Sequence, residues 1–447
     1  EPALLKELQE TQGASTLARR AVDLIRELLP VPRSLTGDGN RRTLDILGRA
    51  VPLQRFEVPS GTPVFDWEVP LEWNVREAYI VGPRGDRVVD FSQHSLHLLN
   101  YSTPVRAKMS LTDLRPHLYS LPDRPDWIPY RTSYWSEQWG FCLTHRQLAA
   151  LPEGEYEVVI DSSLAPGSLT YAEARIPGEL ADEFAIFTHI CHPGLANDNA
   201  TGMATAALLA AELMRSRPRL SYRVIFAPVT IGSITWLTPN EAAARKLRGG
   251  LVIGLLGDPG ALTYKRSRRG NTEVDLIASA VVRGLDSAAR VVDFSPYGYD
   301  ERQLCSPGFN LPIGRLTRSS NGEYPEYHTS ADNLDLVDVG ALTQSIRAIS
   351  DILSRVDSNH RLRRRSPNGE PRLGKRGLFR NTGGESPKSF EYAMLWILNQ
   401  ADGTHGLNDT VAASGLPDTV VRRAAEALID AQLIDDIDLS APTPAES

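Results

Sequence analysis

Strand-like apolar runs alternate with helical segments between about residues 166 and 355, and this alternation limits the possible folds more than any other feature. The run FAIFTH is followed by the helical segment ATGMATAALLAAELMRS, then by YRVIFAPV, a helix near 238–247, LVIGLL, and helices near 275–285 and 340–356. Such alternation is typical of an α/β fold built on a parallel or mixed sheet. The sequence therefore predicts a mixed sheet flanked by helices.

The rest of the chain differs in texture from this core. Residues 61–165 hold short apolar stretches broken by Gly, Pro and Asp, with aromatic strings such as YRTSYWSEQWGFC, which favours a mostly β module. Residues 359–386 are polar and rich in Arg, Gly and Pro, as in a linker, and residues 387–447 have helix-turn-helix texture. We predict a core of residues 1–60 and 166–358, an inserted β domain at 61–165, a linker at 359–386 and a winged helix at 387–447.

Charge and cysteine content limit the function classes of this 447-residue chain. The formal charge of −7 disfavours a broad attraction to nucleic acid or anionic lipid, and the C-terminal unit is not strongly basic. For that unit we prefer a role in protein contacts or in oligomerisation, for example in forming a homo-oligomer. Three cysteines, the lack of a membrane-length apolar run and the lack of a signal-peptide pattern lead us to expect a soluble cytoplasmic protein.

Polar residues follow the predicted strands at the points where these end. His189 and His192 follow FAIFTH, Asp198 precedes the next helix, and Asp258 follows LVIGLL. Ligands gather at the carboxyl ends of strands in α/β sheets, and a catalytic zinc usually takes three His or acidic ligands. His328, in EYPEYHTSADNLDLV after the run LPIGRL, is the best third ligand.

Each of these residues also has a simpler explanation. Lone histidines are mostly packing or capping residues, and Asp198 could cap the helix that it precedes. Cys191 could be a nucleophile beside His189 or His192, although no separate base and orienting pair is evident. The metal site remains the preferred interpretation, because four such residues lie at strand ends of one predicted sheet.

Charged residues near this edge are candidates for binding the substrate. Lys265, in the cationic loop YKRSRRGNTEVD, could hold a carboxylate or phosphate, and a solvated loop is an equal alternative. Asp300, Glu301, Arg302 and Arg318 could line the pocket, although structural salt bridges are the more common use of such residues.

The core resembles the zinc aminopeptidase superfamily, which includes bacterial leucyl aminopeptidases and glutaminyl cyclases. The matching residues are Asp198-Asn199 with Thr201-Gly202, Gly232-Ser233, Asp258, and Tyr327-His328-Thr329 with Asp332. The whole chain is similar to a bacterial family of aminopeptidase-like proteins, often associated with polysaccharide biosynthesis, that carry an inserted β domain and a C-terminal winged helix. Strings that carry this second resemblance include Trp67-Glu68-Val69-Pro70, Trp139-Gly140-Phe141-Cys142, Gly167-Ser168-Leu169-Thr170-Tyr171, His189 through Gly202, Asp300-Glu301-Arg302-Gln303 and Leu373-Gly374-Lys375-Arg376-Gly377-Leu378.

The resemblance implies a metal site that binds one Zn²⁺ per chain. It assigns His189 or His192, Asp198 and His328 as ligands, with Asp258 as a possible fourth. In the superfamily the first histidine is followed, two residues later, by an Asp that orients it. This chain has Cys191 at that position, so either Cys191 replaces the orienting Asp or His192 has become the ligand.

A second departure affects the proton acceptor. The superfamily carries a pair of glutamates before the Gly-Ser motif, one a general base and one a ligand, whereas this chain has Val229 and Thr230 there. A positioned base contributes about 10²- to 10⁴-fold to a rate. The candidate catalytic residues are Glu326, Glu323 and Arg302, and the candidate substrate-binding residues are Arg318, Asp300, Tyr327 and Lys265.

These features favour a zinc-dependent, aminopeptidase-like amide hydrolase that acts on a small amino-acyl substrate or biosynthetic conjugate. The altered base position and the inserted β domain, which resembles a lid or cap above the site, argue against general peptides as substrates. The alternatives are a metal-binding protein without peptidase activity, which senses a ligand through the winged helix, and a metal-dependent transferase or cyclase on the same scaffold.

Overall fold

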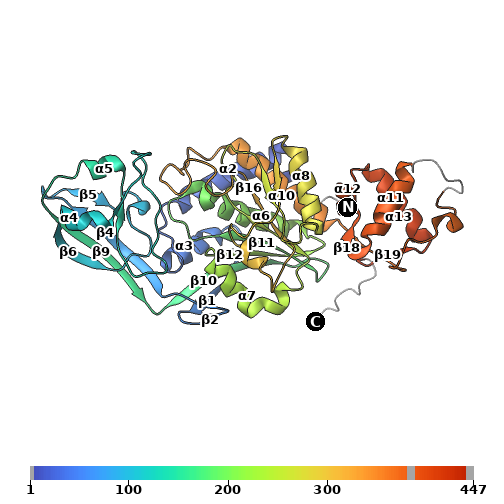
Figure 1. Cartoon of the computed structure of the whole chain (residues 1–447), viewed down its shortest axis with the longest axis horizontal. Coiled ribbons are helices and arrows are strands. Elements are labelled where there is room, and N and C mark those ends of the chain that lie inside the picture. The colour runs from blue at the N-terminus through green and yellow to red at the C-terminus, as the bar shows by residue number, and fades with distance from the viewer. Residues whose placement is uncertain (1–4, 380–387, 439–447) are drawn as a thin grey trace.

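An eight-stranded mixed sheet forms the centre of the chain in a computed structural model, which describes residues 5–379 and 388–438 (Figure 1). The strands, in spatial order, are β1 (Gln54–Pro59), β10 (Ser168–Ile176), β12 (Ser221–Ala227), β11 (Glu183–His189), β13 (Gly249–Ile253), β16 (Ile313–Thr317), β14 (Thr263–Lys265) and β15 (Arg290–Val292). Strands β12, β11, β13 and β16 run parallel. The predicted mixed α/β sheet is therefore confirmed.

Helices cover both faces of this sheet. They are α1 (Lys6–Gln9), α2 (Thr11–Leu28), α3 (Asp38–Leu47), α6 (Thr201–Ser216), α7 (Ile231–Ala244), α8 (Glu273–Leu285), α9 (Glu301–Leu304) and α10 (Val339–Asp357). The apolar stripes of α2, α6, α8 and α10 share one buried cluster with one face of the sheet, whereas α7 packs into a second cluster on the other face. This arrangement leaves the carboxyl ends of the parallel strands for the loops that carry polar residues.

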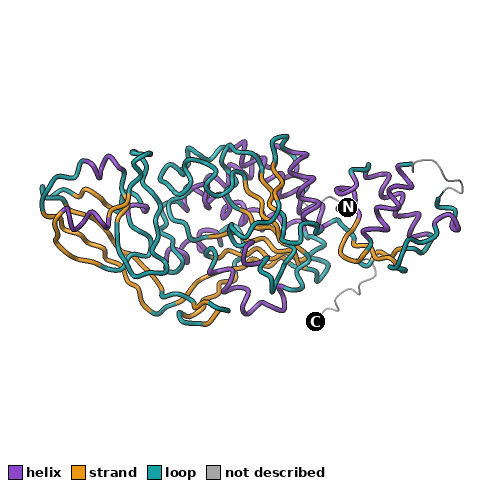
Figure 2. The backbone as a smooth tube through the Cα atoms, viewed as in Figure 1, coloured by secondary structure: helices purple, strands orange, loops and turns teal. Residues whose placement is uncertain are grey.

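A second sheet lies beside the core and belongs to the inserted segment (Figures 1 and 2). Its order is β5 (Arg87–Asp90), β4 (Glu72–Val81), β9 (Glu155–Ala165) and β6 (Val105–Ser110). The insertion also contains two separate strand pairs, β2 (Pro63–Val64) with β3 (Trp67–Glu68) and β7 (Leu118–Tyr119) with β8 (Phe141–Cys142). Its short helices are α4 (Leu111–Leu114) and α5 (His145–Ala149). The insertion shares a buried cluster with α7 and the core sheet, so the two units pack as one body.

The C-terminal unit combines three helices with a three-stranded sheet. The helices are α11 (Ser389–Gln400), α12 (Leu407–Ser414) and α13 (Asp418–Asp430), and the strands are β18 (Asp402–Gly406), β17 (Arg361–Arg364) and β19 (Ile434–Asp436) in spatial order. Residues 361–364 were assigned to the linker, but they form the central strand β17. The segment RLRR buries only Leu362, so it carries no apolar pattern that would mark a strand. Residues 380–387 of the assigned linker lie outside the described residues.

The length and hydropathy of the helices also bear on membranes. Among the described residues, no helix combines the length and the apolar character that a bilayer crossing requires.

His94 in the insertion gives a test of stability against pH. Burial, with a smaller contribution from His97, lowers the pKa of His94 from 6.5 to about 4, so an unfolded chain takes up this proton at a higher pH than the folded chain. Stability should therefore fall as the pH drops from 6.5 towards 4. Between pH 7 and pH 4, the native chain should lose roughly 3 kcal/mol more unfolding free energy than His94→Asn, as measured by denaturant titration.

The variant keeps the local structure because the Asn side chain offers an oxygen to Leu96 N–H, which His94 Nδ1 accepts at 3.1 Å. Equal pH dependence of the two proteins would contradict the assigned cause.

Candidate metal centre

The carboxyl ends of the parallel strands bring four predicted ligands together. His189 is the last residue of β11, His192 lies in the loop after it, and Asp198 lies in the irregular turn Ala196–Ala200 that leads into α6. His328 comes from the loop between β16 and α10, far along the chain. Neighbouring parallel strands end at one edge of the sheet, and this topology explains why distant loops meet there.

Asp198 is the centre of the cluster. Its Oδ1 lies 2.8 Å from His189 Nε2, and its Oδ2 lies 3.0 Å from His328 Nε2 and 4.0 Å from His192 Nε2. Ligand atoms of His189, His192 and Asp198 all lie within 4.8 Å of one another. Imidazole nitrogens and a carboxylate are the donors that zinc prefers, so the residues present fit this ion.

The charges of the cluster suit a cation. Burial alone would raise the pKa of Asp198, but His192, His189 and His328 hold it well below its usual range. Burial lowers the pKa of His192 to about 3, so this imidazole is neutral at physiological pH. A metal ligand must be an ionised carboxylate or a neutral imidazole, and Asp198 and His192 meet these two conditions.

Asp332 holds the turn that carries Asp198. Its carboxylate accepts the backbone N–H of Asn197 at 2.6 Å and that of Asp198 at 3.0 Å. Burial raises the pKa of Asp332 to about 7 against these hydrogen bonds. Asn199 fixes the other side, because its Nδ2 donates to Thr188 Oγ1 and to the His189 carbonyl. The polar residues around Asp198 therefore stabilise a non-helical turn.

Tyrosine rings cover the three imidazoles. Tyr299 stacks on His189 with ring centroids 4.7 Å apart, and Tyr327 stacks on His328 at 3.8 Å. Tyr130 lies 5.2 Å from the His192 ring and 5.0 Å from the His328 ring. The His328 side chain is 32% exposed, so the cluster opens to solvent on its side.

The insertion supplies one wall of this site. Tyr130 N–H donates to the His328 carbonyl at 2.8 Å, and Ser330 N–H donates to the Ile128 carbonyl at 2.8 Å. Sequence reasoning missed Tyr130 and Tyr299. Tyr299 directly precedes Asp300, which the sequence did single out, whereas no local signal marks Tyr130.

Cys191 and Val229 contact each other beside His192. Val229 N–H donates to Cys191 Sγ at 3.3 Å, and Sγ lies 3.4 Å from His192 Nδ1. Burial raises the pKa of the Cys191 thiol, which disfavours the thiolate that a nucleophile needs. The segment that carries glutamates in the resembled superfamily thus offers only a valine and Thr230, whose Oγ1 accepts a hydrogen bond from Gln303.

Asp258 was predicted as a fourth ligand, and the structure corrects this. Its carboxylate accepts hydrogen bonds from Asn197 Nδ2 at 3.0 Å, from Ser319 Oγ at 2.5 Å and from Gly260 N–H. It lies outside the group of ligand atoms around Asp198. Asp258 therefore ties the Asn197 turn to the loop after β16 rather than facing a metal ion.

Three further predicted site residues are committed to other partners. Arg318 is buried against α10, where it donates to the Ala341 carbonyl and to Gln344. Glu323 forms an ion pair with Arg290 at 2.8 Å, and Lys265 forms one with Glu301 at 3.0 Å. Salt bridges and helix contacts thus replace the substrate or catalytic roles predicted for them.

The remaining candidates differ in how far they are exposed. Arg302 is exposed on α9. Glu326 is partly exposed two residues before His328. Asp300 is buried and interacts electrostatically with His189. Glu326, Tyr327 and Asp300 thus remain candidates beside the cluster.

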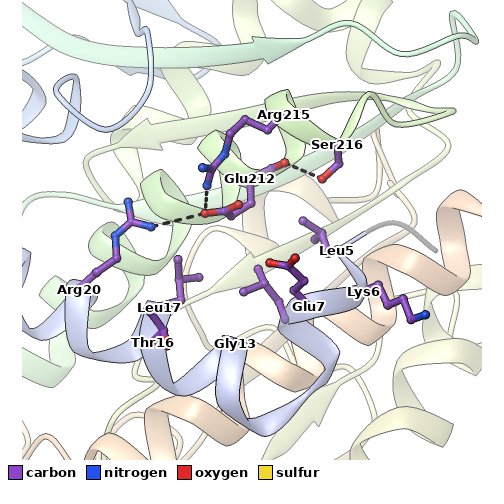
Figure 3. Close-up of a pocket in the computed structure, with 11 residues that line it drawn as sticks. Leu5, Lys6, Glu7, Gly13, Thr16, Leu17, Arg20, Glu212, Arg215 and Ser216 are labelled. Atoms are coloured by element: carbon purple, nitrogen blue, oxygen red, sulfur yellow. Dashed lines mark hydrogen bonds and ion pairs between the residues drawn. The ribbon is translucent and has the colours of Figure 1, made fainter. Parts of the chain in front are cut away.

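Cavity size alone does not identify this site. A cavity of about 610 Å³ lies between the N-terminal helices α1 and α2 and the end of α6, where Glu212 pairs with Arg20 and Arg215 (Figure 3). None of its lining residues belongs to the histidine cluster.

Comparisons with known proteins agree with this architecture. A family model described as "Domain of unknown function (DUF4910)" matches residues 22–359, and a winged helix-turn-helix model matches residues 360–436. A Clostridium acetobutylicum protein, named as a polysaccharide biosynthesis protein with an aminopeptidase-like domain, is 44% identical over 424 residues, which cover 95% of this chain and 98% of that protein.

Solved structures extend the comparison to the fold. A crystal structure from C. acetobutylicum, described as that of a peptidase, has a TM-score of 0.82 at 42% identity and covers 95% of this chain and 98% of its own. The zinc aminopeptidase BSAP of Bacillus subtilis has a TM-score of 0.54 at 12% identity, over 76% of this chain and 94% of its own. The second likeness concerns the fold alone.

Proposed function

Because the chain belongs to the family described as domain of unknown function DUF4910, and its core has the fold of zinc aminopeptidases, we propose that it is a zinc-dependent amide hydrolase. Its substrate is a small amino-acyl compound or biosynthetic conjugate rather than a general peptide. The observation that carries the proposal is the buried Asp198 with three histidines around it. The name of the C. acetobutylicum relative supports a conjugate from polysaccharide biosynthesis.

The roles of the residues follow from their positions. One zinc ion would be held by donors from His189, His192 and Asp198, with His328 beside Asp198 as a further donor. Zinc, when bound, supplies the Lewis acidity that polarises an amide carbonyl. Tyr130 and Tyr327 pack against His328 at the open side of the site and would limit the size of the substrate. Glu326, two residues before His328 and partly exposed, is the proposed proton acceptor in place of the missing glutamate.

One observation favours a second candidate function. Val229 occupies the place of a general base and donates its N–H to Cys191, so this segment provides no proton acceptor. A metal-binding protein that senses a ligand and signals through the winged helix would not need one. Both the hydrolase and the binding protein would contain the metal ion, but only the hydrolase would turn over a substrate.

The experiment that separates them combines metal analysis with an amino-acyl amide screen. The native chain should bind one zinc ion and turn over at least one substrate, while His328→Ala and Glu326→Gln should each lose about 10²- to 10⁴-fold in kcat/KM. Arg76→Ala serves as the control, because Arg76 is exposed and pairs with Asp161 on the surface of the insertion. Peptidase activity that appears only in Val229→Glu, and not in the native chain, would overturn the hydrolase proposal in favour of the binding protein.

A further inference from the structure

A second cavity of about 610 Å³ lies at the N-terminal ends of helices α2 and α10. Thr11 and Ser15 of α2 line it, together with Val339 and Gly340 of α10, and none of its lining residues belongs to the histidine cluster. The first backbone N–H groups of a helix have no acceptor within the helix, and they carry a partial positive charge. Two helix ends of this kind at one cavity favour an anion.

Arg318 lines the same cavity and gives an independent reason to expect an anion. The residue is 5% exposed. Its Nη1 donates to the Ala341 carbonyl and to Gln344, whereas neither Nε nor Nη2 has an acceptor among the described residues. Nε and Nη2 form the edge through which a guanidinium binds two oxygens of one anion. Asp258 and Asp286 attract this side chain electrostatically, but neither forms an ion pair with it.

The other buried arginines in the described part of the chain differ from Arg318. Arg223 and Arg315 form ion pairs with glutamates. Arg33 donates from Nε, Nη1 and Nη2 to backbone carbonyls. Charged side chains are almost never fully buried unless they are paired. Arg318 has neither an ion pair nor a full set of hydrogen bonds, so a partner from outside the chain would complete it.

Arg347 brings a second positive charge to the cavity. Its Nε donates to the Gln9 carbonyl at 3.0 Å, and its two Nη atoms have no acceptor among the described residues. Asp338 also lines the cavity, and its Oδ1 accepts the Ala341 N–H at 2.6 Å. Two arginines against one carboxylate leave the charged lining residues with a net charge of +1.

We propose that this cavity binds a phosphate group, either as inorganic phosphate or as a phosphate monoester, through its two arginines and the N–H groups at the starts of α2 and α10. Arg318 directly follows β16 and Asp338 directly precedes α10, so the cavity lies where the loop that carries His328 starts and ends. A bound phosphate would connect these two ends and stabilise the loop. The proposal does not depend on the proposed metal site.

Arg347→Gln tests the proposal in the full chain. Calorimetric titration with inorganic phosphate at constant ionic strength should show binding to the native chain. The variant should bind about 10- to 100-fold more weakly, because it loses charged hydrogen bonds to the anion. The titration is run with and without a chelator, so that phosphate held by a metal ion is recognised. Arg355→Gln is the matched control, because Arg355 lies on the same helix but pairs with Asp351, and its phosphate affinity should equal that of the native chain.

A titration with a hexose phosphate distinguishes the two sources of the phosphate group. Tighter binding of the hexose phosphate supports a phosphorylated metabolite as the ligand, and equal affinities support free phosphate. A native chain that binds neither compound overturns the proposal, and so does native phosphate affinity in Arg347→Gln. Arg318→Lys keeps the charge but loses the planar fork, so it should also bind more weakly. If this second variant does not fold, Arg347→Gln decides.

Discussion

Asp198→Asn is expected to lower zinc affinity by roughly 100-fold or more, which exceeds the effect of losing a residue that only orients a ligand. Asp198 is fully buried and is the one carboxylate that three imidazoles share. The amide keeps the size of the side chain and removes the charge that attracts the cation. Chelator competition on the purified variant, with circular dichroism as a check on folding, measures the effect.

Asp45→Asn provides the comparison, because Asp45 is an exposed carboxylate that pairs with Arg55. Its zinc affinity should equal that of the native chain. Zinc affinity within threefold of the native value in Asp198→Asn would place the metal elsewhere.

Arg248→Ala is expected to lower the free energy of unfolding by about 3–5 kcal/mol, because it leaves the buried Glu273 carboxylate without an ion pair, whereas Asp438 keeps its pair with Arg361. Arg248 is only 2% exposed in its side chain and pairs with Glu273 of α8 at 2.8 Å and with Asp438 after β19 at 2.9 Å. It also donates to the Asn359 carbonyl at 2.6 Å. This side chain therefore joins the core to the C-terminal unit.

Denaturant titration measures the loss, and limited proteolysis should cut the variant near the junction faster than it cuts the native chain. Arg76→Ala is the control, because Arg76 pairs with Asp161 on the surface, where ion pairs contribute little. Equal unfolding curves for Arg248→Ala and the native chain would show that the junction does not depend on this arginine.

The fold could be predicted from the sequence because its elements have strong local signals. The strands around FAIFTH and LVIGLL are uninterrupted apolar runs, and the helices between them carry long apolar stripes. β17 has no such signal, since its one buried apolar side chain, Leu362, is covered by helices α11 and α13 and its backbone pairs with β18 and β19. Its place in the sheet is a tertiary property.

The candidate site was predictable to a similar degree. Strand ends identify His189, His192, Asp198 and His328, because topology alone brings those loops to one edge. The same logic selected Asp258 at the end of LVIGLL. This logic cannot tell whether a carboxylate already accepts hydrogen bonds from its own neighbours. Here Asn197 and Ser319 donate hydrogen bonds to Asp258.

Partners that lie far apart in the sequence account for the other differences. Glu323 pairs with an arginine of β15, and Arg318 packs against α10. Tyr130 reaches the histidines from an insertion that starts before the core sheet is complete. Such contacts depend on how whole structural units pack together, and no local sequence pattern predicts this packing.

The backbone hydrogen bonds between Ile128–Tyr130 and His328–Ser330 connect the insertion to the loop that carries His328, and this constrains how the chain can evolve. A deletion that removed residues 61–165 would also remove the segment that holds the His328 loop in place. Such a loss should not be tolerated in one step while the proposed metal centre is still in use. The insertion and the histidine cluster should therefore be inherited together, and relatives that lack the first should show a rebuilt His328 loop.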